Sequence, residues 1–106
     1  MAFNNSTDDN FEKEVLGCSI PSVCQFSATW CGPCLQIKPL MEELSEELAG
    51  KIKFFYHDID KSPNTPTQYG VRGVPTLIVF KNKELKSQKV GAIPKSDLKS
   101  WLLENI

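Results

Sequence analysis

A five-residue motif, Trp30-Cys31-Gly32-Pro33-Cys34, separates two segments of different pattern in this chain of 106 residues. The run 22–27 before it is short and mostly apolar and follows Pro21, which is typical of a strand buried on both faces. After the motif, apolar residues recur every three or four positions as far as Gly50, which predicts an amphipathic helix. The two cysteines are therefore expected where a buried strand ends and a helix begins.

That position suits a reactive dithiol. The first N–H groups of a helix have no partner within the helix and carry partial positive charge, which favours a thiolate. We expect Cys31, at the tip, to be the more exposed and more easily ionised thiol, and Cys34, one turn further on, to be more buried. Pro33 suits the first helical turn, and Gly32 lets the backbone of a partner approach.

The reaction that these residues predict is thiol–disulfide exchange. Cys31 attacks a substrate disulfide, and Cys34 then attacks the mixed disulfide, which releases the reduced substrate and leaves a Cys31–Cys34 bond. This cycle needs no metal and no organic cofactor. A zinc site is the alternative. Zinc usually takes four ligands, often as two spaced pairs, and here the remaining candidates are only Cys18, Cys24 and His57.

The rest of the chain alternates between helical and strand patterns, which indicates an α/β fold with a mixed sheet. Further strands are predicted at 52–57, 76–80 and 84–90, with Asn82-Lys83 as a tight hairpin turn. Outside the helix after the motif, helices are predicted near 8–16, with Thr7 as N-cap and Gly17 as the stop, in a short segment before Tyr69-Gly70, and at the C-terminus. Phe3 alone hints at an extra edge strand. We expect one domain over residues 1–106.

The composition limits the partners of the chain. With 12 basic and 13 acidic residues and a net charge of −1, it lacks the positive charge of an electrostatic nucleic-acid binder. Its longest apolar run, 77–80, is far too short for a membrane span, and the first residues lack the pattern of a signal peptide. We therefore expect a cytoplasmic monomer that binds neither nucleic acid nor membrane. In the cytoplasm, structural disulfides are rare, so the four cysteines suggest redox chemistry, a metal or simple burial.

The motif and several other segments resemble the thioredoxin family, from about residue 7 to the C-terminus. The matching segments are Thr7-Asp8-Asp9 with Phe11, the motif at 30–34, Pro39, the segment 69–76, Phe80-Lys81-Asn82 and Val90-Gly91-Ala92. The resemblance implies the thioredoxin fold, a central mixed sheet flanked by helices on both faces. It also implies a carrier in electron transport and cell redox homeostasis, which reduces protein disulfides and is itself reduced by a thioredoxin reductase.

The resemblance further implies a cis peptide bond between Val74 and Pro75, facing the Cys31 sulfur, and pairing of the substrate backbone with residue 74 like an added strand. The alternative is that Pro75 only begins an edge strand. The substrate-binding surface predicted in this way consists of Trp30, Gly32, Pro33, Gly73, Val74, Pro75, Gly91 and Ala92.

The chain departs from the family pattern around the dithiol. Where thioredoxins usually carry a buried Asp on the strand under the site, this chain has Gln25, and Tyr56 and Leu35 replace two common lysines. The Asp is regarded as a proton acceptor for the second cysteine, a role that a Gln amide cannot take at neutral pH. We therefore count Gln25 as a catalytic-site residue whose contribution differs. The usual Gly of the hairpin turn is Lys83, so the turn geometry is expected to differ as well.

Three further residues have simpler interpretations. Cys24, on a buried strand, is expected to act as a small hydrophobic residue, and His57, at the end of a strand, as a structural one. Cys18 follows a predicted helix end, where a thiol can be exposed, so either it takes no part in the reaction or it forms a regulatory or intermolecular disulfide. For the whole protein, two alternatives to a reductase stay open: a redox-inert docking module with this fold, and a more oxidising, isomerase-like protein.

Overall fold

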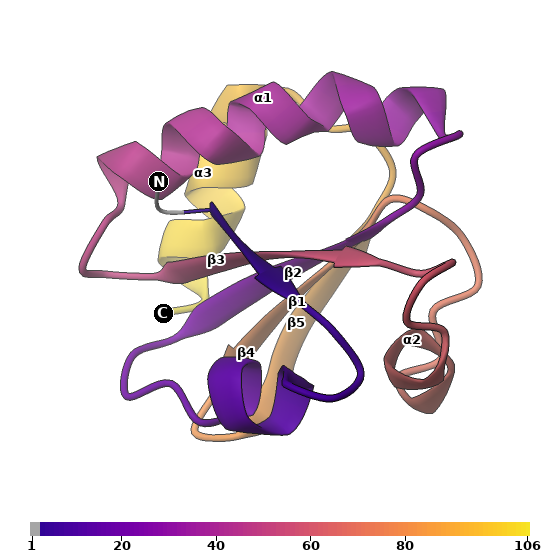
Figure 1. The fold of residues 1–106 in the computed structure, drawn as a ribbon. Helices are drawn as coiled ribbons and strands as arrows, with labels where there is room; N and C mark the ends of the chain where they lie inside the picture. Colours follow the sequence, from indigo (N-terminus) through magenta and orange to yellow (C-terminus); the bar gives the residue numbers. More distant parts are fainter. Residues whose placement is uncertain (1–2) are drawn as a thin grey trace.

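A computed structural model describes residues 3–106 of the chain. Its centre is a five-stranded mixed sheet with the strand order β1-β3-β2-β4-β5 (Figure 1). The strands β1, β3 and β2 run parallel to one another, whereas β4 is antiparallel to β2 and to β5. The strands are β1 (Phe3–Ser6), β2 (Ser22–Ser27), β3 (Lys53–Asp58), β4 (Thr76–Lys81) and β5 (Glu84–Val90).

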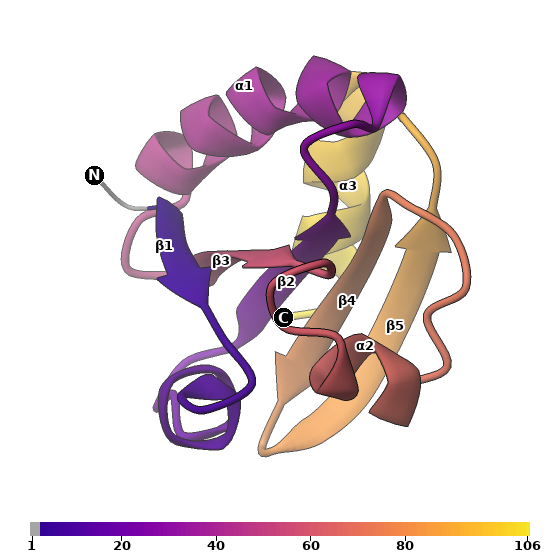
Figure 2. The same cartoon turned by 45° about the vertical axis from the view of Figure 1, so that its right-hand side comes forward.

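Helices cover both faces of the sheet, as the fold prediction requires. The helices α1 (Gly32–Glu47) and α3 (Lys95–Glu104) lie on one side, and the π-helix η1 (Phe11–Leu16) and the short α2 (Asn64–Gln68) lie on the other (Figures 1 and 2). Because apolar layers cover both faces, all six residues of β2 are buried, which confirms the interpretation of the run 22–27.

Each face of the sheet has its own apolar core. Beneath α1 and α3 the core includes Val23, Ile37, Met41, Leu44, Phe54, Leu77, Leu98 and Trp101. Beneath η1 it includes Phe11, Val15, Cys24, Phe26, Phe55, Ile78 and Phe80. Successive residues of one strand point to opposite faces, so the odd-numbered positions of β2 face α1 and the even-numbered ones face η1. This alternation decides which side chains can reach the start of α1.

The predicted helix near 8–16 is confirmed in its end at Gly17 but wrong in its start, because Asn10 and not Thr7 is the N-cap. The helix η1 begins at Phe11, after a turn in which Thr7 and Asn10 each accept the backbone N–H of the other through a side-chain oxygen, at 3.1 and 2.7 Å. The Asp8 carboxylate accepts the backbone N–H groups of Asn64 and Thr65 at 3.0 and 2.8 Å, so it contacts α2 and not its own first turn. These partners lie more than fifty residues away, outside the reach of a local pattern.

The strands at the two edges of the sheet agree with the predictions from the sequence. β1 forms an edge strand that pairs Phe3 with Phe54, and β4 and β5 form the predicted hairpin. In its turn, Asn82 and Lys83 have φ values of 54° and 69°. Two consecutive residues in the left-handed region are typical of the type I′ turn, which matches the twist of the two strands.

Candidate active site

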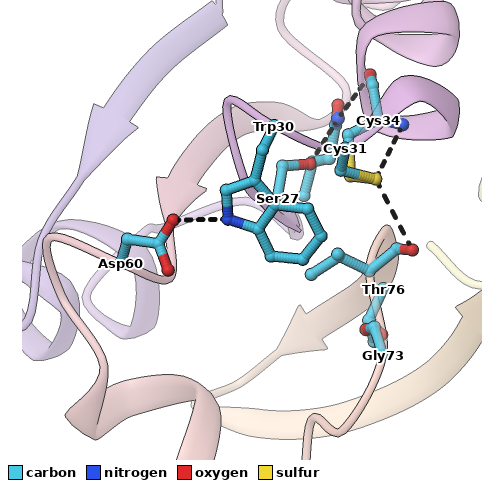
Figure 3. Close-up of a disulfide and its surroundings, with 9 residues drawn as sticks. Ser27, Trp30, Cys31, Cys34, Asp60, Gly73 and Thr76 are labelled. Atoms are coloured by element: carbon cyan, nitrogen blue, oxygen red, sulfur yellow. Dashed lines mark hydrogen bonds between the residues drawn. A yellow bond between two sulfur atoms is a disulfide. The ribbon is translucent and has the colours of Figure 1, made fainter.

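The two cysteines lie at the junction of β2 and α1. Cys31 has extended backbone and is the N-cap of α1, and its Sγ accepts the backbone N–H of Cys34 at 3.2 Å. The two sulfurs form a disulfide, with the Cα atoms 5.2 Å apart (Figure 3). Cys31 keeps 5% of its surface exposed, whereas Cys34 has none. Pro33 occupies the first turn, where its missing N–H costs no hydrogen bond.

A loop from a distant part of the chain faces the Cys31 sulfur. The Val74–Pro75 peptide bond is cis, as the resemblance implied, and the Val74 carbonyl oxygen is 3.7 Å from Cys31 Sγ (Figure 3). Gly91 donates its backbone N–H to the Pro75 carbonyl at 2.9 Å, which brings the segment after β5 beside the same loop. Within the loop, the Thr76 hydroxyl donates to the Gly73 carbonyl at 2.6 Å.

The remaining residues predicted to bind substrate differ in exposure. Trp30 is 68% exposed, and its indole N–H donates to the Asp60 carboxylate at 2.8 Å (Figure 3). Asp60 was not foreseen from the sequence, although it follows β3 at the same edge of the sheet as the motif that follows β2. Gly32, Pro33, Gly73 and Ala92 are exposed, Val74 and Gly91 are half-buried, and Pro75 is buried.

Gln25 lies on β2 under the first turn of α1, as expected for the position of the family Asp. It is completely buried, and its Nε2 donates to the Ser27 hydroxyl at 2.7 Å and to the Cys34 carbonyl at 3.4 Å. Among the described residues, Oε1 of Gln25 has no hydrogen-bond partner. Tyr56 is the residue directly opposite Gln25 on β3. The side chain that β2 places beneath Cys34 is therefore polar but uncharged.

The other titratable residues singled out from the sequence lie apart from the dithiol. Cys24 and His57 face η1, and burial raises the pKa of the Cys24 thiol to about 12. Cys18 is half-buried; its thiol donates to the Glu14 carbonyl at 2.9 Å, and burial raises its pKa. Within residues 3–106, no three histidine, cysteine or acidic side chains are grouped as metal ligands would be. The same residues include no helix long and apolar enough to cross a membrane.

A disulfide at a strand–helix junction, with one sulfur at the helix tip and a cis-proline loop against it, defines a thiol–disulfide oxidoreductase. Comparison with known proteins agrees: the family model Thioredoxin matches residues 2–104. The chain belongs to the thioredoxin family, and its activity is that of a protein-disulfide oxidoreductase with Cys31 and Cys34 as the redox-active pair.

Individual relatives support this membership over almost the whole chain. Thioredoxin of Rickettsia felis is 45% identical over 103 residues, which covers 97% of this chain and 98% of the relative. Thioredoxin of Acidithiobacillus ferridurans is 46% identical over 96 residues, covering 91% and 89%. The M-type chloroplastic thioredoxin of Pisum sativum is 46% identical over 91 residues, covering 86% of this chain and 53% of the relative.

Proposed function

We propose that the chain works in the reducing direction, with Cys31 as the nucleophile and Cys34 as the resolving cysteine. The observation that carries this assignment is the position of Cys31 Sγ at the N-cap of α1, where it accepts the Cys34 N–H. Of the two cysteines, Cys31 is partly exposed to solvent and Cys34 is completely buried. The same N–H group stabilises a thiolate at Cys31 once the disulfide is reduced. Cys34 is completely buried and bonds to the Cys31 sulfur, which suits it to attack the mixed disulfide in the second step.

The substrate binds across the surface beside Cys31. The exposed Trp30 provides a large apolar contact, and Val74 offers its backbone to an extended segment of the partner. Gly32, Pro33, Gly73, Pro75, Gly91 and Ala92 complete this surface. Beyond Ala92, a groove of about 230 Å³ continues between α1 and the segment before α3, lined by Gln36, Ile37, Leu40, Ala92, Ile93 and Pro94. An extended, disulfide-containing protein segment fits such a surface better than a small molecule does.

The physiological setting follows from the same assignment. An upstream thioredoxin reductase returns Cys31 and Cys34 to the dithiol, so the chain acts as an electron carrier in cell redox homeostasis. It functions as one thioredoxin domain over residues 1–106, a cytoplasmic monomer. A net charge of −1 supports protein partners over nucleic acid or an anionic membrane surface.

The cysteine assignment is tested by trapping. We expect Cys34→Ser to accumulate mixed disulfides with substrate proteins and Cys31→Ser to accumulate none. In the reduced protein, iodoacetamide is expected to alkylate Cys31 much faster than Cys34, as measured by mass spectrometry of the peptides. Cys18→Ser serves as a control, because it removes the half-buried thiol without touching the dithiol. Equal alkylation rates for Cys31 and Cys34 would contradict the assignment.

A second candidate function is a more oxidising, isomerase-like activity, which the uncharged amide of Gln25 beneath Cys34 favours. Without a carboxylate at position 25, no buried negative charge directly beneath Cys34 opposes a thiolate, so the dithiol is stabilised relative to the disulfide. Equilibration with glutathione buffers separates the two functions. A strongly reducing potential for the Cys31–Cys34 pair supports the reductase, and a potential near that of disulfide isomerases supports the second candidate.

A further inference from the structure

The turn between β3 and α2, residues 58–62, borders the active site although it is distant from the cysteine motif in sequence. Ile59 packs against the buried cluster that contains the two active-site cysteines. The next residue, Asp60, accepts the indole N–H of Trp30 at 2.8 Å (Figure 3). Because Trp30 is the exposed aromatic residue of the proposed substrate surface, the position of this turn affects how that surface is presented.

Hydrogen bonds fix the local shape of the turn and join its start to the sheet. Ile59 donates its backbone N–H to the Ser27 carbonyl of β2 at 2.9 Å. The Asp58 carboxylate accepts the backbone N–H of Asp60 at 2.9 Å, and the Asp58 carbonyl accepts that of Ser62 at 3.0 Å. The end of the turn needs a contact of its own with the rest of the protein.

A buried histidine provides this contact. His57 Nε2 lies 2.9 Å from the Ser62 carbonyl oxygen, and because a carbonyl can only accept, Nε2 is the donor. On the other side of the ring, Nδ1 lies 2.9 Å from the Ser6 hydroxyl of β1. Burial lowers the pKa of His57 below its usual value of 6.5, so the ring is neutral at pH 7 and Nδ1 accepts the Ser6 proton. The two partners thus fix one tautomer.

The ring of His57 has little freedom to move, because it is completely buried. Its centroid lies 6.0 Å from that of Phe11 and 5.0 Å from that of Phe26. A fixed ring that donates to Ser62 holds the end of the turn at a set place beside β3. Asp60 precedes Ser62 by two residues, so the place of its carboxylate depends on the same hydrogen bond.

Resting on the proposed function, we propose that His57 is a positioning residue of the active site: its hydrogen bond to the Ser62 carbonyl holds the turn 58–62 so that Asp60 orients the Trp30 indole for substrate proteins. His57 acts through the turn and not on the sulfurs, since its ring packs against Phe11 of η1 on the far side of the sheet from α1. Its effect therefore falls on the binding of a protein disulfide more than on the exchange reaction itself.

This role is local to the turn. The Asp8 carboxylate holds the start of α2 separately, through the backbone N–H groups of Asn64 and Thr65. Loss of the contact between His57 and Ser62 is therefore expected to shift the turn without detaching α2. A small disulfide does not extend over Trp30, so it should depend on the turn much less than a protein substrate does.

The test compares His57→Met, which has no donor, with His57→Gln, whose longer amide can still donate to Ser62, in a Cys18→Ser background. The reduced proteins are oxidised by insulin and by oxidised glutathione, and the ratio of the two rate constants is measured. We expect this ratio to fall about fivefold in His57→Met, which corresponds to about 1 kcal/mol, and to recover most of the loss in His57→Gln.

A double-mutant cycle tests the link to Trp30. Asp60→Ala breaks the last hydrogen bond directly, so it should lower the same ratio, and adding His57→Met should lower it no further, because both changes act through one set of contacts. NMR gives a direct measure: the Trp30 indole N–H, assigned with Trp30→Phe, is expected to exchange with solvent faster in His57→Met than in the parent.

Ser22→Ala is the matched control, because it removes a buried hydrogen bond to the Val15 carbonyl at the other end of β2. It is expected to lower stability and to leave the ratio unchanged. If His57→Met does not fold, His57→Asn decides, since its shorter amide keeps the Ser6 contact but does not reach Ser62. A ratio within twofold of the parent in these variants, or a ratio in His57→Gln as low as in His57→Met, overturns the proposal. A parent protein that does not reduce insulin overturns the proposed function itself.

Discussion

Gln25 places an uncharged amide at the point where a carboxylate would control the dithiol. Its Oε1 is buried without a hydrogen-bond partner among the described residues, while its nitrogen serves both Ser27 and the Cys34 backbone. A buried negative charge at this position would disfavour a second anion on the neighbouring sulfurs. Replacing Gln25 by a charged or by an uncharged residue of similar size therefore distinguishes the effect of charge from the effect of packing at the site.

We expect Gln25→Asp to shift the pH dependence of Cys31 alkylation upward and the reduction potential in the reducing direction. It is also expected to speed resolution of the mixed disulfide, because a carboxylate accepts a proton directly. The free energy of unfolding is expected to fall, since the new charge has no lysine at position 56 to pair with. Alkylation rates, glutathione equilibration and urea unfolding measure the three effects.

Gln25→Asn is the matched control, because it has the size of Asp without its charge. It is expected to destabilise the fold but to leave the pH dependence of Cys31 alkylation unchanged. If Gln25→Asp and Gln25→Asn behave alike in the titration and in the resolution rate, Gln25 acts through packing alone.

Among the structural elements, the turn of the β4–β5 hairpin requires a left-handed backbone conformation at Asn82 and at Lys83, which Asn tolerates better than Lys. Asn82 and Lys83 both have positive φ, but only Asn commonly tolerates the left-handed region among residues with a side chain. A Gly at position 83, as in the family pattern, would suit this positive φ, and Lys83 adopts it nonetheless. The turn is thus set by the twist of β4 and β5 and by their pairing, at some cost in local conformational energy.

Lys83→Gly is expected to stabilise the protein by about 1 kcal/mol. A left-handed residue with a side chain costs roughly 1–2 kcal/mol, and the greater entropy of Gly in the unfolded chain offsets about 0.5–1 kcal/mol of the gain. The urea midpoint is the measurement. The control is Lys86→Gly on β5, where φ is not positive, and there a loss of about 1 kcal/mol is expected. A lower midpoint for Lys83→Gly would disprove the explanation.

At the scale of the whole molecule, His57 joins parts of the chain that are distant in sequence. Completely buried on β3, it shares a hydrogen bond with the Ser6 hydroxyl of β1 at 2.9 Å, and its Nε2 lies 2.9 Å from the Ser62 carbonyl. Asp8 lies 3.6 Å from the same nitrogen. Burial lowers the pKa of His57 below 6.5, an effect that the Ser62 carbonyl and the charges of Asp8 and Asp58 oppose.

This shift makes the stability of the fold depend on pH in a defined window. Below pH 6.5 the unfolded chain binds a proton at His57 that the folded chain does not, so the free energy of unfolding falls as the pH drops from 6.5 towards the lower folded pKa. The slope approaches about 1.4 kcal/mol per pH unit. The pKa of Asp8 is lowered from 3.8 by hydrogen bonds from Thr65 and Asn64, against the effect of burial, so its contribution is lost only at pH values below 3.8.

Urea unfolding at pH 7.5, 6.0 and 5.0 measures the His57 contribution. We expect the parent protein to lose stability over this range and His57→Gln, which does not titrate, to lose much less, although its stability at pH 7.5 is lower. Parallel pH profiles for the two proteins would show that other groups cause the dependence.

Much of the fold and of the site could be predicted from local patterns. The strand at 22–27, the redox motif, the hairpin and the C-terminal helix all follow from apolar periods and turn residues within a few positions of one another. The position of Cys31 at a helix tip follows as well, because a buried strand and an amphipathic helix flank the motif directly. Periods of two and of 3.6 residues are properties of the backbone, so a short segment already expresses them.

The tertiary structure alone decided which distant groups meet. Asp8 bonds to α2 rather than to its own helix, Trp30 bonds to Asp60, and Gln25 lies opposite Tyr56. Each pair joins groups about thirty or more residues apart, and the sheet order β1-β3-β2-β4-β5 brings them together. A local pattern determines which face of a strand a side chain occupies, but the neighbour on that face depends on strand order and register. These are set by the packing of the whole chain.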